Sequence, residues 1–211
     1  MVVAVLGIPE TIIELLEYLL IFDMARLESH IKHNLYTLAN ETIADFAKYI
    51  TNDDPLELLV ARQNMVCKTL YNYFDNWNFC GIYYQPFDEY FPETNTQTYK
   101  NELRIWVHES DKIPCNPISL DGICGDAIRD GAPNIIVPDV SLSENHIVCD
   151  KNTKSELVIP FTFDFGGSSS NMPIKMVLDI DSKELNDFND GIDVEYLNEI
   201  MRKFFRTQQE I

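Results

Sequence analysis

Four stretches decide the fold of this chain: IPCNPISLDGICGDAIRDG at 113–131, NIIVPDV at 134–140, NHIVCDKNTKSE at 145–156 and MVLDIDS at 176–182. The first predicts a short helix over 122–130 that stops at Gly131. The second predicts a strand over 134–137 that breaks at Pro138. The third reads as a polar loop, and the fourth is apolar on both faces, as in a central strand. This mixture of short helices and strands is typical of an α+β domain.

The other predicted elements lie on both sides of these stretches. Strands are predicted at 79–84, 103–108, 156–163 and 174–180, the last two joined across GGSSSN as a hairpin. Residues 86–100 are rich in Pro, Asn and Thr and form a predicted loop. Helices are predicted over 9–36, 41–50, 55–74, with Asp54 as the N-cap of this third helix, and 193–207. We therefore expect a central antiparallel sheet of five or six strands flanked by helices.

Composition and charge limit the classes of function. The chain has 211 residues with 34 acidic and 16 basic side chains, a formal net charge of −18, and no cluster of Lys and Arg. A protein that binds nucleic acids or anionic membranes needs a basic face, so neither is an expected partner. The apolar start is interrupted by four acidic residues and is too charged to span a membrane. We expect a protein of the cytoplasm, with the nucleus left open, because no signal peptide is evident.

Three of the five cysteines stand among the carboxylates of the deciding stretches. Cys124 lies at the start of the predicted short helix, where the helix dipole is expected to lower its pKa. Cys115 and Cys149 lie at turn-like positions, whereas Cys67 and Cys80 fit a buried core. Three thiols and His146 could bind zinc, but the spacings match no compact zinc motif. No metal is therefore predicted, and thiol redox chemistry is the favoured interpretation.

Three acidic side chains are predicted to meet near these thiols. Asp179 and Asp181 are two residues apart on one strand and therefore point to the same face of the sheet. Glu156 begins the neighbouring strand of the hairpin. Carboxyl groups crowded in a pocket have raised pKa values, so that one of them can stay protonated near neutral pH. Such a group can donate a proton to an oxygen that leaves its substrate.

The combination of these motifs resembles a known family. GICG, VPDV, HIVCD followed by a Ser-Glu pair, and LDIDS are similar in order and spacing to the free methionine-R-sulfoxide reductases, which are single GAF-type domains. The resemblance covers about residues 115–190. It implies a GAF-type catalytic domain, assigned here to residues 41–211, preceded by a helical extension over residues 1–40. The apolar face of that extension has two interpretations, packing on its own domain or across the interface of a homodimer.

The resemblance also implies an activity and its residues. The expected reaction is reduction of the R epimer of free methionine sulfoxide, part of the response to oxidative stress, with thioredoxin or another dithiol as reductant and no cofactor. Cys149 corresponds to the family's loop cysteine and is assigned as the nucleophile. Cys115 is assigned as the main resolving thiol, and Cys124 as an alternative to either. Glu156, Asp179 and Asp181 correspond to the family's substrate-binding carboxylates.

The chain departs from the family pattern at the first strand. Phe79 stands where the family has a Trp that packs on the substrate methyl group, and Trp77 is a candidate substitute. Two other functions are therefore kept beside the first. One is a GAF sensor module that binds a small ligand or responds to redox state without catalysis. The other is a reductase of a different small sulfoxide.

Overall fold

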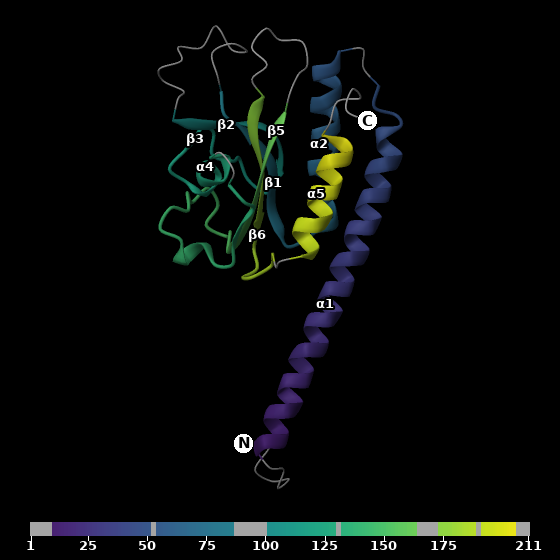
Figure 1. The fold of residues 1–211 in the computed structure, drawn as a ribbon, viewed down its shortest axis with the longest axis vertical. Helices are drawn as coiled ribbons and strands as arrows, with labels where there is room; N and C mark the ends of the chain where they lie inside the picture. The colour runs from purple at the N-terminus through teal and green to yellow at the C-terminus, as the bar shows by residue number, and fades with distance from the viewer. Residues whose placement is uncertain are drawn as a thin grey trace.

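The structure, a computed structural model, describes residues 10–51, 54–86, 101–129, 132–163, 173–188 and 191–205 (Figure 1). The predicted loop over 86–100, apart from residue 86, the GGSSSN turn and the helix stop at Gly131 lie outside these ranges. The elements are, in chain order, α1 (Glu10–Ala47), α2 (Pro55–Tyr73), β1 (Trp77–Tyr84), β2 (Glu102–Ser110), β3 (Ile118–Ser119), α4 (Ile123–Ile128), β4 (Ile135–Val137), the 3-10 helix η2 (Val140–Leu142), β5 (Ser155–Phe163), β6 (Ile174–Ser182) and α5 (Ile192–Phe204).

The strands form one six-stranded sheet in the order β3-β2-β1-β6-β5-β4. Every neighbouring pair is antiparallel, which confirms the predicted α+β architecture. Strand β6 lies between β1 and β5, and its residues alternate between the two faces of the sheet. This central place explains why MVLDIDS is apolar on both faces except at its acidic positions.

A hydrophobic core lies on each face of the sheet. Helices α1, α2 and α5 cover one face (Figure 1), and their buried side chains pack there with Cys67, Cys80 and Trp77. The short helix α4 covers the other face, where its Ile123 and Ala127 pack with Phe79 and other strand residues. The cysteines that were predicted to be structural therefore lie in one core, and the predicted redox cysteines lie on the opposite side of the sheet.

Helix α1 is continuous where the sequence analysis predicted a break between two helices. Two helices were expected, over 9–36 and 41–50, but the structure has one continuous helix, Glu10–Ala47. The intervening residues contain neither Pro nor Gly, so nothing in the sequence ends the helix there. The proposed division at residue 40 falls inside this helix and stays a prediction.

A buried ion-pair network fixes the second half of α1 to the domain. The Lys32 ammonium group donates to the Asp193 carboxylate at 2.9 Å and also pairs with Asp187. The Tyr36 hydroxyl donates to the same Asp193 carboxylate at 2.8 Å. Because all of these side chains are buried, the network specifies one position for α1 against the start of α5.

Local signals set the start of α2 and the edge of the sheet. The Asp54 side chain accepts hydrogen bonds from the backbone N–H groups of Leu56 and Glu57, which confirms the predicted N-cap. Strand β3, only two residues long, was not predicted, because two residues show no periodicity. It pairs with the start of β2 and leads the chain from Cys115 into α4.

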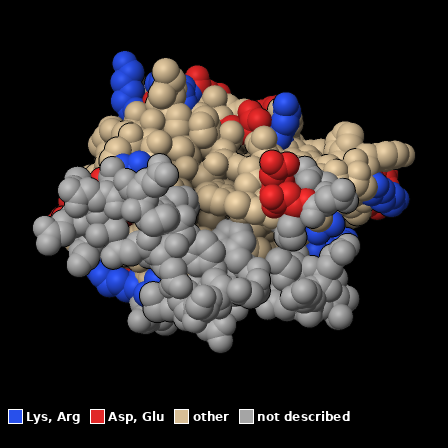
Figure 2. Space-filling model, turned by 90° about the horizontal axis from the view of Figure 1, so that it is seen from above, with Lys and Arg blue, Asp and Glu red and all other residues tan. Residues whose placement is uncertain are grey.

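The surface agrees with the charge analysis. On the described part of the face seen in Figure 2, the basic side chains are scattered among neutral and acidic ones. This arrangement offers no continuous basic strip on that part of the face for a nucleic-acid backbone. Among the residues that the structure describes, no helix has the length and apolar character required to cross a membrane.

Candidate functional site

A pocket opens on the α4 face of the sheet. Its empty volume is about 600 Å³, part of which is open to solvent. The sheet contributes its base through β1, β5 and β6, and the segments around Cys124, Pro114 and Cys149 form its walls. The predicted residues Phe79, Cys124, Cys149, Glu156, Asp179 and Asp181 all line it. An aromatic ring, two cysteine sulfurs and three carboxyl groups give the pocket the mixed apolar and polar lining that is typical of small-molecule sites.

The three predicted carboxylates come together at the base of the pocket. Glu156 pairs with Asp181 across β5 and β6, and Asp179 lies two residues along β6 on the same face. Burial raises the pKa of Asp179 well above its ordinary value, and the charges of Asp181 and Glu156 raise it further. Burial, followed by the charge of Glu156, likewise raises the pKa of Asp181. A protonated carboxyl group can therefore persist here at a pH where exposed carboxyl groups are ionised.

The carboxylate cluster lowers the stability of the empty protein. Asp179 is only 7% exposed, and its Oδ1 atom has no hydrogen-bond partner among the described residues. Because the pKa of Asp179 is raised in the folded protein, stability falls progressively as the pH rises above the pKa of the carboxyl group in the unfolded chain, about 3.9, and the loss is complete only above the folded-state pKa. The site thus carries a cost that a cationic ligand would offset.

Asp179→Asn should therefore stabilise the empty protein. We expect a gain of about 1 kcal/mol in the free energy of unfolding at pH 7, a common size for a stabilising substitution. The gain should fall toward zero below about pH 4, because the carboxyl group is then protonated in both the folded and unfolded states. Urea denaturation at several pH values measures both quantities. A variant less stable than the parent at pH 7 would refute this account of the cluster.

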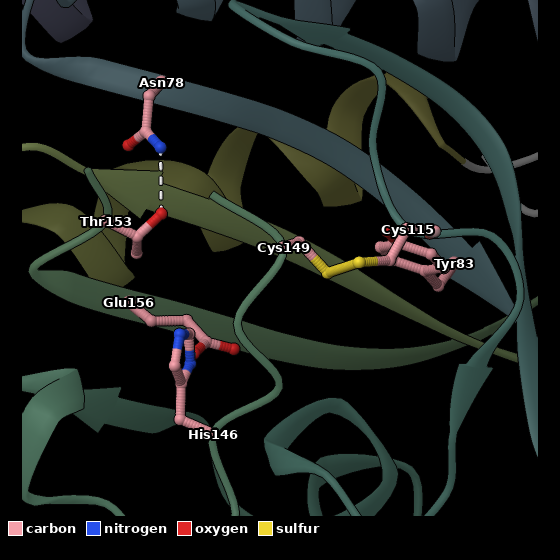
Figure 3. The surroundings of a disulfide bond; sticks show 7 residues. All are labelled: Asn78, Tyr83, Cys115, His146, Cys149, Thr153 and Glu156. Atoms are coloured by element: carbon pink, nitrogen blue, oxygen red, sulfur yellow. Dashed lines mark hydrogen bonds and ion pairs between the residues drawn. A yellow bond between two sulfur atoms is a disulfide. The ribbon is translucent and has the colours of Figure 1, made fainter. Parts of the chain in front are cut away.

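The structure joins Cys115 and Cys149 by a disulfide at the wall of the pocket (Figure 3), with their Cα atoms 5.5 Å apart. Cys115 lies between β2 and β3, and Cys149 lies in the loop before β5. This is the pairing that the family resemblance implies. The catalytic roles of the two cysteines stay predictions, but the disulfide establishes that their sulfur atoms can meet beside the carboxylates.

Two polar contacts hold the segments that carry these cysteines. The Lys112 ammonium group pairs with the Asp150 carboxylate at 2.5 Å, which links a residue before Cys115 to the residue after Cys149. The Tyr83 hydroxyl donates to the Cys115 carbonyl oxygen at 2.9 Å. Neither contact depends on the disulfide. When the thiols are reduced, the ion pair can keep the two segments together, and the Tyr83 hydroxyl can keep the Cys115 segment on β1.

Cys124 differs from its predicted character. It is buried beside the carboxylates, and burial raises its pKa well above the ordinary value, with further increases from the charges of Asp179 and Glu156. The expected lowering by the helix dipole is therefore wrong. Helix α4 has only six residues, and its effect is outweighed by the loss of water and by the acids. Cys124 thus carries less thiolate than the sequence suggested.

His146 is a residue of the site that the sequence analysis considered only as a metal ligand. Its Nδ1 atom lies 3.0 Å from Glu156 Oε2, and both side chains are largely buried (Figure 3). His146 precedes Cys149 by three residues in the same loop. The contact therefore ties the Cys149 loop to the carboxylate cluster. The only sequence signal was the position of His146 in NHIVCD, which does not show which strand the ring faces.

The two aromatic candidates are on opposite faces of the sheet. Phe79 lines the pocket, and its role in binding stays a prediction. Trp77 is stacked on Phe74 in the core under α1, α2 and α5, with ring centroids 4.2 Å apart. The predicted contact of Trp77 with a substrate is therefore wrong. In a regular strand, two residues that are two positions apart have their side chains on the same face. The pairing of β1 with β6 is irregular between Trp77 and Phe79, so the two rings lie on opposite faces.

One group in the pocket has the donor atoms for a cation. Ligand atoms of Cys124, Glu156 and Asp179 all lie within 4.8 Å of one another. The sequence analysis considered a different zinc site, made of three cysteines and His146. Cys115 and Cys149 cannot bind a metal as thiolates while they are joined in a disulfide. The prediction that the protein uses no metal stays a prediction.

Comparison with known proteins gives relatives of two descriptions. No family model matches the chain. It is 41% identical over 104 residues to GAF domain-containing protein A of Dictyostelium discoideum, covering 49% of this chain and 60% of that protein. It is 35% identical over 108 residues to the free methionine-R-sulfoxide reductase of Saccharomyces cerevisiae, covering 51% of this chain and 56% of that protein. The matches thus span less than two thirds of these relatives.

Solved structures agree on the fold. The free methionine-R-sulfoxide reductase of Neisseria meningitidis, in complex with its substrate, has a TM-score of 0.57 and 26% identity, covering 87% of this chain and 93% of that chain. A solved GAF domain has a TM-score of 0.58 and 22% identity, covering 82% of this chain and 87% of that chain. These comparisons confirm the predicted resemblance: the chain has a GAF fold and is similar in sequence and structure to free methionine-R-sulfoxide reductases.

Proposed function

We propose that this GAF-fold relative of the free methionine-R-sulfoxide reductases reduces the R epimer of free methionine sulfoxide to methionine. The observation that carries the proposal is the Cys115–Cys149 disulfide at the wall of a pocket that also holds three carboxyl groups. The disulfide is the expected oxidised product of the reaction, and the acids are the groups needed to bind an amino acid and to protonate an oxygen. The similarity to the yeast and Neisseria enzymes supports the choice of substrate.

The proposed chemistry has three balanced steps. The Cys149 thiol attacks the sulfoxide sulfur, the S–O bond of the substrate breaks, and Cys149 ends as a sulfenic acid while methionine leaves. The Cys115 thiol then attacks the Cys149 sulfur and releases the oxygen as water, which forms the disulfide. Thioredoxin or another dithiol reduces this disulfide and is itself oxidised. No further cofactor is required.

The carboxyl groups have two proposed tasks. One protonated group of the cluster hydrogen-bonds the sulfoxide oxygen and assists its departure, and Asp181, whose pKa is raised by burial, is the proposed donor. The remaining negative charge binds the ammonium group of the amino acid. His146 keeps the Glu156 carboxylate in place through the 3.0 Å contact and so acts as a positioning residue. Phe79 lines the pocket, and its proposed task is to pack against the methylthio end of the substrate.

The test is an assay of the reduced full-length protein with free methionine-R-sulfoxide and either thioredoxin with its reductase or dithiothreitol. We expect multiple turnovers to methionine with either reductant, and little activity on the S epimer. Absence of methionine together with a thermal shift by another small ligand would contradict the proposal and favour the sensor. Faster turnover of another small sulfoxide would instead favour the divergent reductase.

The buried carboxylates also predict selectivity for a free amino group. N-acetylation of methionine-R-sulfoxide removes the positive charge and leaves the sulfoxide unchanged. We expect kcat/KM to fall at least about tenfold, because the cluster would lose a charge-assisted contact and stay uncompensated. The same should hold for methionine sulfoxide within a peptide. Equal kcat/KM values for the free and N-acetylated substrates would show that the acids do not bind the ammonium group.

A further inference from the structure

The fold assembles a group of metal-binding atoms at the base of the pocket. The thiol of Cys124 and the carboxyl groups of Glu156 and Asp179 each offer one atom, and these atoms lie within 4.8 Å of one another. The three residues come from α4, β5 and β6, and all of them are buried side chains that line the pocket. The group is therefore a product of the tertiary structure, and no sequence spacing announces it.

One atom of this group lacks a partner. Asp179 is only 7% exposed, and its Oδ1 atom has no hydrogen-bond partner among the described residues. A buried carboxylate oxygen is costly when nothing compensates it. A cation held between Asp179, Glu156 and Cys124 would supply the missing partner. Asp181, which lies opposite Glu156 in the sheet, adds negative charge that favours a cation further.

The chemistry of the donors selects a borderline ion such as Zn²⁺. Zn²⁺ binds thiolate sulfur and carboxylate oxygen together in tetrahedral sites, with bonds of about 2.0–2.3 Å. Since that geometry sets ligand atoms about 3.5 Å apart, the observed separations of at most 4.8 Å need to shrink by no more than about 1.3 Å. Mg²⁺ and Ca²⁺ suit the group less, because they prefer about six or more oxygen ligands.

His146 supports one of the three ligands. Its Nδ1 atom lies 3.0 Å from Glu156 Oε2, and Figure 3 shows the imidazole ring beside the Glu156 carboxyl group. Carboxylates that bind metals are themselves commonly held by hydrogen bonds, which fix their orientation. Three protein ligands leave the fourth position of a tetrahedral ion to a water molecule from the pocket.

We propose that Cys124, Glu156 and Asp179 form a Zn²⁺ site whose occupation excludes the substrate. The Cys124 thiol gives its proton to the buffer when it binds the ion, and nothing is oxidised or reduced. The ion takes the carboxylates that are assigned to the substrate ammonium group, so Zn²⁺ acts as an inhibitor and is not needed for the reaction. The inhibition rests on the proposed function, whereas the binding of the metal does not.

The binding test uses the full-length protein with the Cys115–Cys149 disulfide formed, so that neither of these sulfurs can bind the metal. Co²⁺ is the probe, because it takes tetrahedral zinc sites and gives a charge-transfer absorption band when a thiolate is a ligand. We expect one Co²⁺ per chain with this band, and its displacement by Zn²⁺. Cys124→Ser should abolish the band, and Asp179→Asn should raise the Kd for Co²⁺ at least about tenfold.

Two control variants locate the site. Cys67→Ala removes a buried thiol from the core on the other face of the sheet, and Asp121→Asn removes an exposed carboxyl group outside the pocket. Both should keep the band and the Kd of the wild type. Absence of the thiolate band in the wild type, or an equal band in Cys124→Ser, would overturn the site. An unchanged Kd in Asp179→Asn would overturn it as well, even if Cys124→Ser failed to fold.

A single turnover tests the inhibition. Pre-reduced, desalted protein is mixed with free methionine-R-sulfoxide, with or without one equivalent of Zn²⁺. We expect Zn²⁺ to slow the release of methionine at least about tenfold, EDTA to restore it, and Asp179→Asn to be slowed less than the wild type. Equal slowing in Asp179→Asn would assign the effect to other thiols and overturn the inhibition. A protein that releases no methionine even with EDTA would contradict the proposed function, and the Co²⁺ result would be unaffected.

Discussion

Cys149→Ser should abolish sulfoxide reduction, with a fall in kcat of at least about 1,000-fold. The proposed first step forms a bond from the Cys149 sulfur, and a serine hydroxyl is neither sufficiently ionised near neutral pH nor able to form a sulfenic acid. The pocket and its carboxylates should persist, because only one atom changes. Steady-state release of methionine with dithiothreitol as reductant measures the effect.

Two further variants separate the nucleophile from its surroundings. Cys115→Ser should retain turnover with dithiothreitol, which can reduce a sulfenic acid directly, but should lose turnover with thioredoxin. Val148→Ala changes the exposed side chain next to Cys149 and should behave as wild type. A Cys149→Ser protein that consumes the sulfoxide at the wild-type rate would reassign the nucleophile. Loss of activity in Cys124→Ser but not in Cys149→Ser would assign it to Cys124.

Asp181→Asn should lower kcat/KM by about 100-fold. Asparagine keeps the size of the side chain but removes a charge beside Glu156, so the pocket attracts the substrate ammonium group less strongly. If Asp181 mainly binds substrate, most of the loss should appear in KM. If it mainly donates the proton to the oxygen, most should appear in kcat. Steady-state kinetics with free methionine-R-sulfoxide separates the two.

Asp121→Asn is the matched control for Asp181→Asn. It makes the same chemical change in the segment before α4, at an exposed position that does not line the pocket. Both substitutions replace one carboxyl group by an amide of the same size, so a difference in kcat/KM reports on the position of the carboxyl group. Equal kinetic constants for Asp181→Asn and wild type would remove Asp181 from the proposed binding site.

The sequence predicted the acidic part of the site because strand periodicity is a local property. Asp179 and Asp181 share a face of β6 since side chains alternate along a strand, and the hairpin brings Glu156 opposite Asp181. The pairing of Cys115 with Cys149 is different. These residues are separated by 34 positions in the sequence, and only the family resemblance connected them.

Most of the errors came from tertiary contacts that no local pattern reveals. An irregularity in the pairing of β1 turned Trp77 to the face opposite Phe79. Burial beside Asp179 outweighed the helix dipole at Cys124. His146, in the loop before β5, contacts Glu156 on β5, and this contact depends on the path of the loop. The predicted break in α1 had a different cause: it was a local error, since no helix-breaking residue stands between the two predicted helices.

The most direct test of the account is a single turnover of the pre-reduced protein with free methionine-R-sulfoxide and no reductant, followed by alkylation of the remaining thiols, digestion and mass spectrometry. The account predicts one methionine released for each Cys115–Cys149 disulfide formed, with Cys67 and Cys80 alkylated as thiols. Methionine release without that disulfide, or no methionine at all, would contradict it.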